Sequence, residues 1–134
     1  MREILFRGRQ RFSTKWVEGS LHVIENKGSE FTWILTPSIH GSIEVSPSSV
    51  GAYTGRTDRN GKKIFEGDIV KTWLEGGAHS GFSWPLGVVE FRESAFGLAH
   101  GKYKFTPFSS YATRVLMEVV GNIHDNPELL KGGE

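Results

Sequence analysis

The chain has 134 residues, no cysteine, and 16 basic against 15 acidic side chains, which gives a net charge of +1 with neutral histidines. This length suits one domain with its own core, and the missing cysteines exclude disulfides, thiolate zinc sites and cysteine nucleophiles. The balanced charge excludes a global attraction to nucleic acid or to an anionic membrane, so any basic function must be local.

The N-terminus carries no targeting pattern. The stretch MREILFRGRQRF returns to a charged residue at Arg7 before an apolar segment of signal-peptide length can form. No run of the chain approaches the ~20 apolar residues of a membrane span. Because the absence of cysteine also fits a reducing compartment, we expect a soluble cytoplasmic protein with no membrane partner.

The first half of the chain has the pattern of short strands joined by turns, as the 17 glycines also indicate. Aromatic and β-branched residues dominate Ile4–Phe6, Lys15–Ile24 and Phe31–Leu35, which we expect to be strands. The dipeptide Ser46-Pro47 predicts one helical turn, with the serine hydroxyl accepting a backbone hydrogen bond and the proline in the first turn.

Two tight turns are expected in the middle of the chain. Asn60-Gly61 is typical of a type I′ hairpin turn, because both residues tolerate the positive φ that this turn requires. Glu66-Gly67-Asp68 then bends the chain before the next strand. The residues assigned to structural turns are Asn60, Gly61, Gly67 and Asp68.

Asp58-Arg59-Asn60-Gly61 also resembles the start of a calcium loop, in which side-chain oxygens at alternate positions and a closing glutamate converge on the ion. Here Lys62 occupies the fifth position, Lys63 replaces the glycine of the sixth, and Ile69 stands in the twelfth. We therefore expect no metal site. No motif indicates another cofactor.

The same segment predicts a candidate binding surface. Its residues are Arg56, Arg59, Lys62 and Lys63, joined by Trp84 from a later loop. Cations and a stacking aromatic residue are the groups with which proteins hold phosphates and unpaired bases. The alternative interpretation is a set of solvated side chains on an exposed turn, which is the commoner role of such charges.

Four further strands are expected in the second half of the chain. They are Ile69–Leu74, Leu86–Arg92, Phe96–Ala99 and Leu116–Ile123. In the second of these, Val89 and Phe91 share one face while Val88, Glu90 and Arg92 share the other, which suits the half-buried wall of a small barrel.

The segments around these strands have simpler interpretations. The glycine-rich stretch Glu75–Gly81 predicts a solvated loop, because it lacks the Lys-Ser or Lys-Thr of a phosphate-binding loop. Trp33 and Trp73 are expected in the core, as aromatic residues usually are in a small barrel. Asn126-Pro127 repeats the cap-and-proline pattern and predicts a C-terminal helix of one or two turns.

No pattern of catalytic residues is present in the sequence. The five histidines are scattered, without the spacing of a zinc protease, and no Gly-x-Ser-x-Gly nucleophile elbow occurs. His124-Asp125 are neighbours that we interpret as a surface turn, because adjacent side chains usually point apart. We expect no enzyme activity and nominate no catalytic residue.

Four blocks of the sequence carry a family resemblance. In chain order they are REILFRGRQ, VGAYTGRTDRNGKKIFEGDIVK, LGVVEFRESAFGL and EVVGNIHDNPELL. Together they resemble the YopX family of small phage and prophage proteins over nearly the whole chain. The chain departs from the family at Arg56, where leucine is common, and at His124, where tyrosine is common.

The resemblance implies one mainly β domain over residues 1–134. Residues 53–134 would form an SH3-like small barrel, with an N-terminal β region of residues 1–52 laid against it. It implies no agreed activity, cofactor or catalytic residue. Small barrels of this class bind peptides, nucleic acids or each other, so the fold alone does not choose among these functions.

The leading hypothesis is therefore a non-enzymatic phage or prophage accessory protein that acts by binding a phage or host protein. Self-association into a homo-oligomer through exposed strand edges belongs to the same hypothesis, because short strands in a partly open barrel leave backbone groups unpaired. The alternative is a nucleic-acid-binding module that uses the basic candidate surface.

Overall fold

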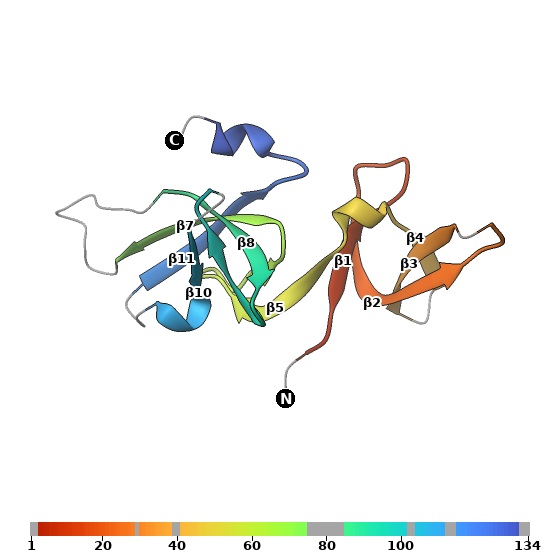
Figure 1. Ribbon diagram of the computed structural model, residues 1–134, viewed down its shortest axis with the longest axis horizontal. Helices are drawn as coiled ribbons and strands as arrows, with labels where there is room; N and C mark the ends of the chain where they lie inside the picture. Colours follow the sequence, from red (N-terminus) through yellow and green to blue (C-terminus); the bar gives the residue numbers. More distant parts are fainter. Residues whose placement is uncertain are drawn as a thin grey trace. The chain divides into compact units, whose positions relative to one another are not determined.

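The computed structural model is mainly β and describes residues 3–28, 30–38, 41–74, 85–101, 104–111 and 115–131 (Figure 1). The chain divides into two compact units, Met1–Gly55 and Arg56–Glu134. The expectation that both parts form one domain, with two regions meeting at residues 52 and 53, stays a prediction. Trp84 and the loop expected over Glu75–Gly81 lie outside the described residues.

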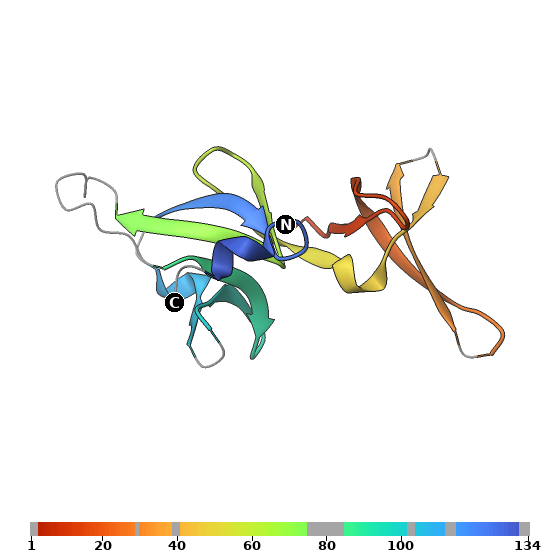
Figure 2. The ribbon, with the colours of Figure 1, turned by 90° about the horizontal axis from the view of Figure 1, so that it is seen from above.

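The first unit is an antiparallel sheet in the order β4-β3-β2-β1-β5. Its elements are β1 (Phe6–Arg9), β2 (Trp16–Glu25), β3 (Phe31–Ser38), β4 (Gly41–Glu44), the 3-10 turn η1 (Pro47–Ser49) and β5 (Gly51–Thr57), whose last residues belong to the second unit. β2 and β3 form a long hairpin in which Val23 lies opposite Trp33. In Figure 2 its tip projects beyond the rest of the unit. Leu35 and Val45 are fully buried.

The turn η1 begins at Pro47, as the sequence predicts, but the side chain of Ser46 does not cap it. Ser49 supplies the side-chain bonds instead. Its hydroxyl donates to the carbonyl oxygen of Ser46 at 2.6 Å and accepts from the N–H of Arg9 at 2.7 Å. The buried Ser49 therefore ties the turn to β1.

The second unit contains a five-stranded antiparallel sheet in the order β10-β9-β8-β7-β11. Its elements are β6 (Lys63–Phe65), β7 (Asp68–Leu74), β8 (Gly87–Arg92), β9 (Ala95–Ala99), β10 (Phe105–Pro107), η3 (Phe108–Ser110), β11 (Val115–Asn122) and η4 (Pro127–Leu130), of which η3 and η4 are 3-10 turns. The short strand β6 pairs with β5.

The second unit has its own apolar core. The buried cluster consists of Ile64, Val70, Val89, Leu98, Phe108 and Met117. Along β7, Val70 and Thr72 are fully buried, whereas Lys71 between them is exposed, as the alternation of side chains along a strand requires. Burial of these apolar groups is the main stabilising contribution to the unit.

Within the described residues, the sheet does not close into the barrel that the sequence predicts. The edge strand β10 has three residues and ends at Pro107, which has no N–H to donate. At the other edge, a turn meets β11. Arg59 N–H donates to the oxygen of Met117 at 2.9 Å, and Val119 N–H donates to Asp58 Oδ2 at 3.0 Å. The unit is therefore an open sheet with a turn bonded to one edge.

The strands expected over Lys15–Ile24 and Phe31–Leu35 are present, as are all four in the second half, with ends shifted by a few residues. The strand predicted over Ile4–Phe6 begins later in the structure, because β1 covers Phe6–Arg9. The C-terminal segment forms a single turn of 3-10 helix. Trp33 and Trp73 are half-buried, so the prediction that they belong to the buried core is wrong.

Candidate functional site

The Asp-x-Asn-Gly segment is a hairpin tip organised by the carboxylate of Asp58. One carboxylate oxygen accepts from the N–H groups of Asn60 and Lys62, both at 2.9 Å, and the other accepts from Val119 at 3.0 Å. Burial alone would raise the pKa of Asp58, but these three backbone bonds and the charge of Lys62 outweigh it and lower the pKa. The carboxylate thus fixes the backbone of the turn and joins it to β11.

The hairpin tip is a three-residue turn rather than the type I′ turn that Asn60-Gly61 predicts. Asp58 N–H donates to the oxygen of Lys62 at 2.7 Å, and Gly61 N–H donates to the oxygen of Asp58 at 3.0 Å. Among the described residues of the tip, Gly61 alone has a positive φ, at 80°, whereas type I′ requires two. The bond from Asn60 N–H to the Asp58 side chain explains the difference, because it favours an ordinary turn followed by a left-handed glycine.

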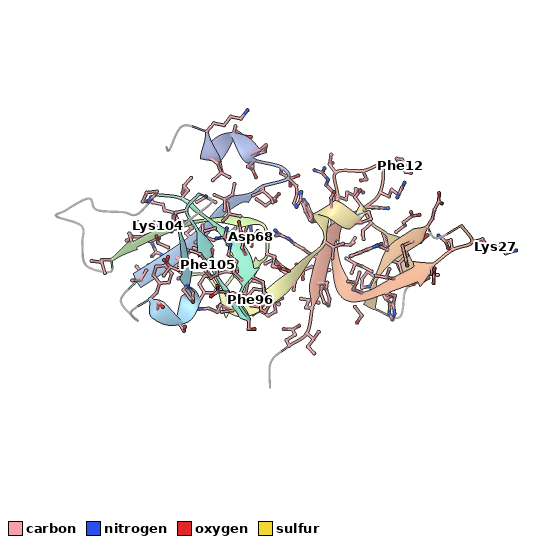
Figure 3. All side chains as sticks on the ribbon, in the orientation of Figure 1. Phe12, Lys27, Asp68, Phe96, Lys104 and Phe105 are labelled. Atoms are coloured by element: carbon pink, nitrogen blue, oxygen red, sulfur yellow. The ribbon has the colours of Figure 1, made fainter. Side chains whose placement is uncertain are left out.

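The turn at Glu66-Gly67-Asp68 joins three strands. Asp68, labelled in Figure 3, is 1 % exposed and accepts a hydrogen bond from Phe65 N–H at 2.8 Å. Gly67, with φ at 88°, donates its N–H to the oxygen of Val89 and accepts from Ile123 N–H, both at 2.9 Å. This turn therefore connects β6 to β8 and to the end of β11.

The basic residues of the candidate surface point to different partners. The guanidinium carbon of Arg56 lies 5.2 Å from the ring centroid of Phe108, and its Nη1 donates to the oxygen of Phe108 at 3.3 Å. The guanidinium of Arg59 lies 5.4 Å from the ring centroid of Trp73. Lys62 is exposed and Lys63 is half-buried. Because Trp84 lies outside the described residues, its place beside these cations stays a prediction.

A cavity of about 670 Å³ lies in the second unit, beside one face of β8 and β9 and the turn η4. Its apolar lining consists of Leu86, Val88, Ala99, Leu129 and Leu130, together with Pro85. A concave apolar site of this size, with few polar groups, is typical of ligand and side-chain recognition. We name it the η4 pocket.

Charged groups line the other side of the η4 pocket. The Nε of Arg92 lies 2.8 Å from Glu90 Oε1. The guanidinium of Arg92 also lies 5.3 Å from the ring centroid of Phe105. Lys104, labelled with Phe105 in Figure 3, is exposed and forms no ion pair within the described part of the chain. Since Glu90 offsets Arg92, the ammonium of Lys104 leaves the pocket with a positive charge.

The pKa values of two ionisable rings in the η4 pocket are shifted in the direction that favours their neutral forms. Burial lowers the pKa of His100, with a further lowering by Lys104, against a hydrogen bond to the backbone of Leu86 that raises it. Burial raises the pKa of Tyr111, and a hydrogen bond with Thr106 offsets this in part. His100 packs closely on β8, because a Cβ atom at Gly87 would lie 2.9 Å from its Cε1.

The sequence carried one signal for the η4 pocket. The alternation along β8 predicts that Val88, Glu90 and Arg92 share a face, and all three line the cavity. The other lining residues, such as Lys104 and Leu130, come from segments that are far apart in the sequence. Only tertiary packing brings these segments together.

His124-Asp125 form a turn after β11. Asn122 Oδ1 accepts hydrogen bonds from the N–H groups of His124 and Asp125, both at 2.9 Å. This bonding pattern is that of an Asx turn.

None of the helices in the described part of the chain has the length and apolar character that crossing a membrane requires.

The fold and the motifs agree with comparisons to known proteins. Protein EF1440 from Enterococcus faecalis has a similar structure, with a TM-score of 0.58 and 20 % identity, over 98 % of this chain and 100 % of that chain. Protein yopX from Bacillus subtilis matches with the same TM-score and 19 % identity, again over 98 % of this chain and 100 % of that chain. At such identities the likeness concerns the fold alone. No curated protein matches the sequence. The family model described as YopX protein matches residues 5–131, so the chain belongs to the YopX family.

Proposed function

We propose that this protein is a phage- or prophage-derived accessory protein that works in the cytoplasm by binding a partner, without catalysis. The observation that carries the proposal is the η4 pocket, which combines an apolar lining with neutral His100 and Tyr111 and a positively charged Lys104. Such a site suits binding, because it is concave and mostly apolar with a few polar groups that orient a ligand.

The chemistry of the η4 pocket favours an aliphatic group that carries a carboxylate, supplied by a segment of a phage or host protein. Leu86, Val88 and Leu130 offer apolar surface, and Lys104 offers a donor for an anion. A carboxylate bonded to an ammonium is also the stronger kind of hydrogen bond, so it would orient the ligand.

Octanoate is a simple probe for this group. We expect it to shift the amide resonances of Val88, Ala99 and Leu130 in a nuclear magnetic resonance titration, whereas octylamine leaves them unchanged. Lys104→Glu should weaken octanoate binding by roughly tenfold, because a hydrogen bond to a charged group is lost and a repulsion is added. Lys27→Glu, the same charge change in the first unit, should have no effect. Unchanged pocket resonances with octanoate, or equal binding of octylamine, would contradict the proposal.

The finer expectations on fold and assembly belong to the same proposal. We infer that the second unit is a partly open member of the SH3-like class, and that the protein self-associates through exposed strand edges. The edge position of β10 supports this, since an edge strand leaves backbone groups on one side available for pairing. Light scattering after size exclusion tests it, and a strictly monomeric mass at high protein concentration would contradict self-association.

The second candidate function is nucleic-acid binding. It is favoured by the position of Arg59, which lies against Trp73 at the surface of the second unit. The aromatic residue beside Arg59 in the described part of the chain is Trp73 on β7, and the place of Trp84 beside the same cations stays a prediction.

A further inference from the structure

Trp73 lies on the outer face of β7 with two cations beside its ring. The guanidinium carbon of Arg59 is 5.4 Å and the ammonium nitrogen of Lys71 is 5.5 Å from the ring centroid. Lys71 and Trp73 are two residues apart on one strand, so they share a face, while Thr72 between them is fully buried in the opposite direction. The indole itself is half-buried and keeps exposed surface. We call these three residues the Trp73 cluster.

The backbone that carries Arg59 is firmly held. Its N–H donates to the oxygen of Met117 on β11 at 2.9 Å. The preceding residue, Asp58, is bonded to Val119 on the same strand and to Asn60 and Lys62 within the turn. β11 runs beside β7, as Figure 1 also shows, and in this pairing Leu116 lies opposite Trp73. The guanidinium is therefore presented to the indole by a rigid turn, which lowers the entropy cost of binding a ligand there.

The two cations of the Trp73 cluster outnumber Glu118, the acidic residue that faces them across the strands. Neither Arg59 nor Lys71 forms an ion pair with another described residue, although Glu118 lies opposite Lys71 in the strand register. Arg59 and Lys71 carry two positive charges against the one negative charge of Glu118, so the cluster keeps a net positive charge that favours an anion. Exposed Lys62 on the same turn adds a third cation nearby in sequence.

We propose that the Trp73 cluster binds single-stranded nucleic acid, with a base stacked on the indole and neighbouring phosphates held by Arg59 and Lys71. The inference rests on the second candidate function and gives it a location. Single strands are favoured over a duplex because stacking on a side chain needs an unpaired, exposed base face.

Fluorescence anisotropy of a labelled oligodeoxythymidine at low salt tests the proposal. Trp73→Leu should weaken binding by about five- to 150-fold, the range expected for the loss of one stacked base. The matched control is Trp16→Leu, which removes another indole that has an arginine at 4.9 Å, and it should leave the affinity unchanged. A duplex of the same length should bind more weakly than the single strand.

A second variant keeps the test independent of the packing around Trp73. Replacing both Arg59 and Lys71 by Ala should flatten the plot of log K against log salt by about 1.4 units, since single strands lose about 0.7 units per phosphate contact. No binding at tens of micromolar protein would overturn the second candidate function together with this inference. Binding that is insensitive to Trp73→Leu and to the double variant would overturn the inference alone. Neither result bears on octanoate binding in the η4 pocket.

Discussion

Asp58 and Asp68 are buried carboxylates whose partners are backbone N–H groups. Asp58 stands two residues before Asn60 and Asp68 follows Gly67, a composition shared by binding loops and by turns. Local chemistry was therefore enough to predict bends at both places. It was not enough to predict the bond from Asp58 to Val119, which joins residues 61 apart in the sequence. The turn geometry, which the dipeptide Asn60-Gly61 alone predicts wrongly, follows from the local bond of Asn60 N–H to Asp58.

Asp58→Asn should lower the free energy of unfolding by about 1.5–3 kcal/mol at neutral pH, the range for hydrogen bonds to a charged group. The folded pKa of Asp58 lies below its usual value, so its stabilising contribution is present above about pH 4 and is lost as the pH falls through the folded pKa. Urea unfolding across the acidic range measures both effects. The variant should lose this part of the acid dependence, whereas exposed Asp125→Asn should keep it. Equal acid dependence in the parent and Asp58→Asn would contradict the assignment.

Strands were predictable where apolar and polar residues alternate or where β-branched residues dominate, as in β2, β7 and β8. β4, β5 and β10 were missed because glycine, threonine, serine or proline occupies much of each, and tertiary pairing outweighs those weak local preferences. The absence of a closed barrel among the described residues has a related reason. Closure of a barrel requires the two edge strands to pair with each other, which depends on segments far apart in the sequence. Here the edge strand β11 forms hydrogen bonds with the turn at Asp58 and Arg59.

The turn between β8 and β9 is strained in a way that the sequence does not reveal. Arg92 pairs with Ala95, and the two residues between them, Glu93 and Ser94, have φ values of 50° and 67°. Both angles match a type I′ turn, for which Asn-Gly is preferred. Replacing the pair by Asn-Gly should therefore stabilise the protein by about 1 kcal/mol and raise the melting temperature by a few degrees.

Thermal melts followed by circular dichroism measure this gain. Ser48→Gly is the matched control, because Ser48 is exposed in a 3-10 turn without positive φ, where glycine only adds freedom to the unfolded chain. That variant should melt at a lower temperature than the parent. A melting temperature of the Asn-Gly variant at or below the parent value would contradict the strain.

The larger apolar core, the η4 pocket and the Trp73 cluster all belong to the second unit. The sequence indicated the β8 face of the pocket and the basic hairpin. It did not indicate the convergence of β8, β10 and η4, nor the pairing of Arg59 with Trp73, because these depend on contacts between segments far apart in the chain. The first unit shows fewer fully buried apolar side chains among its described residues, with Leu35 and Val45 at 0 % exposure.

This difference in burial predicts unequal local stability. Each fully buried aliphatic side chain contributes about 1.5–3 kcal/mol, so the first unit should open at a lower free energy than the second. In native-state hydrogen exchange, amides of the β2–β3 hairpin should therefore lose protection at lower urea than amides of β7 and β8. Leu35→Ala should accelerate exchange in the hairpin, where Leu35 lies opposite Leu21, and leave β7 and β8 unchanged. If Leu35→Ala accelerated both sets equally, the two units would unfold as one, and the difference in their cores would not govern their opening.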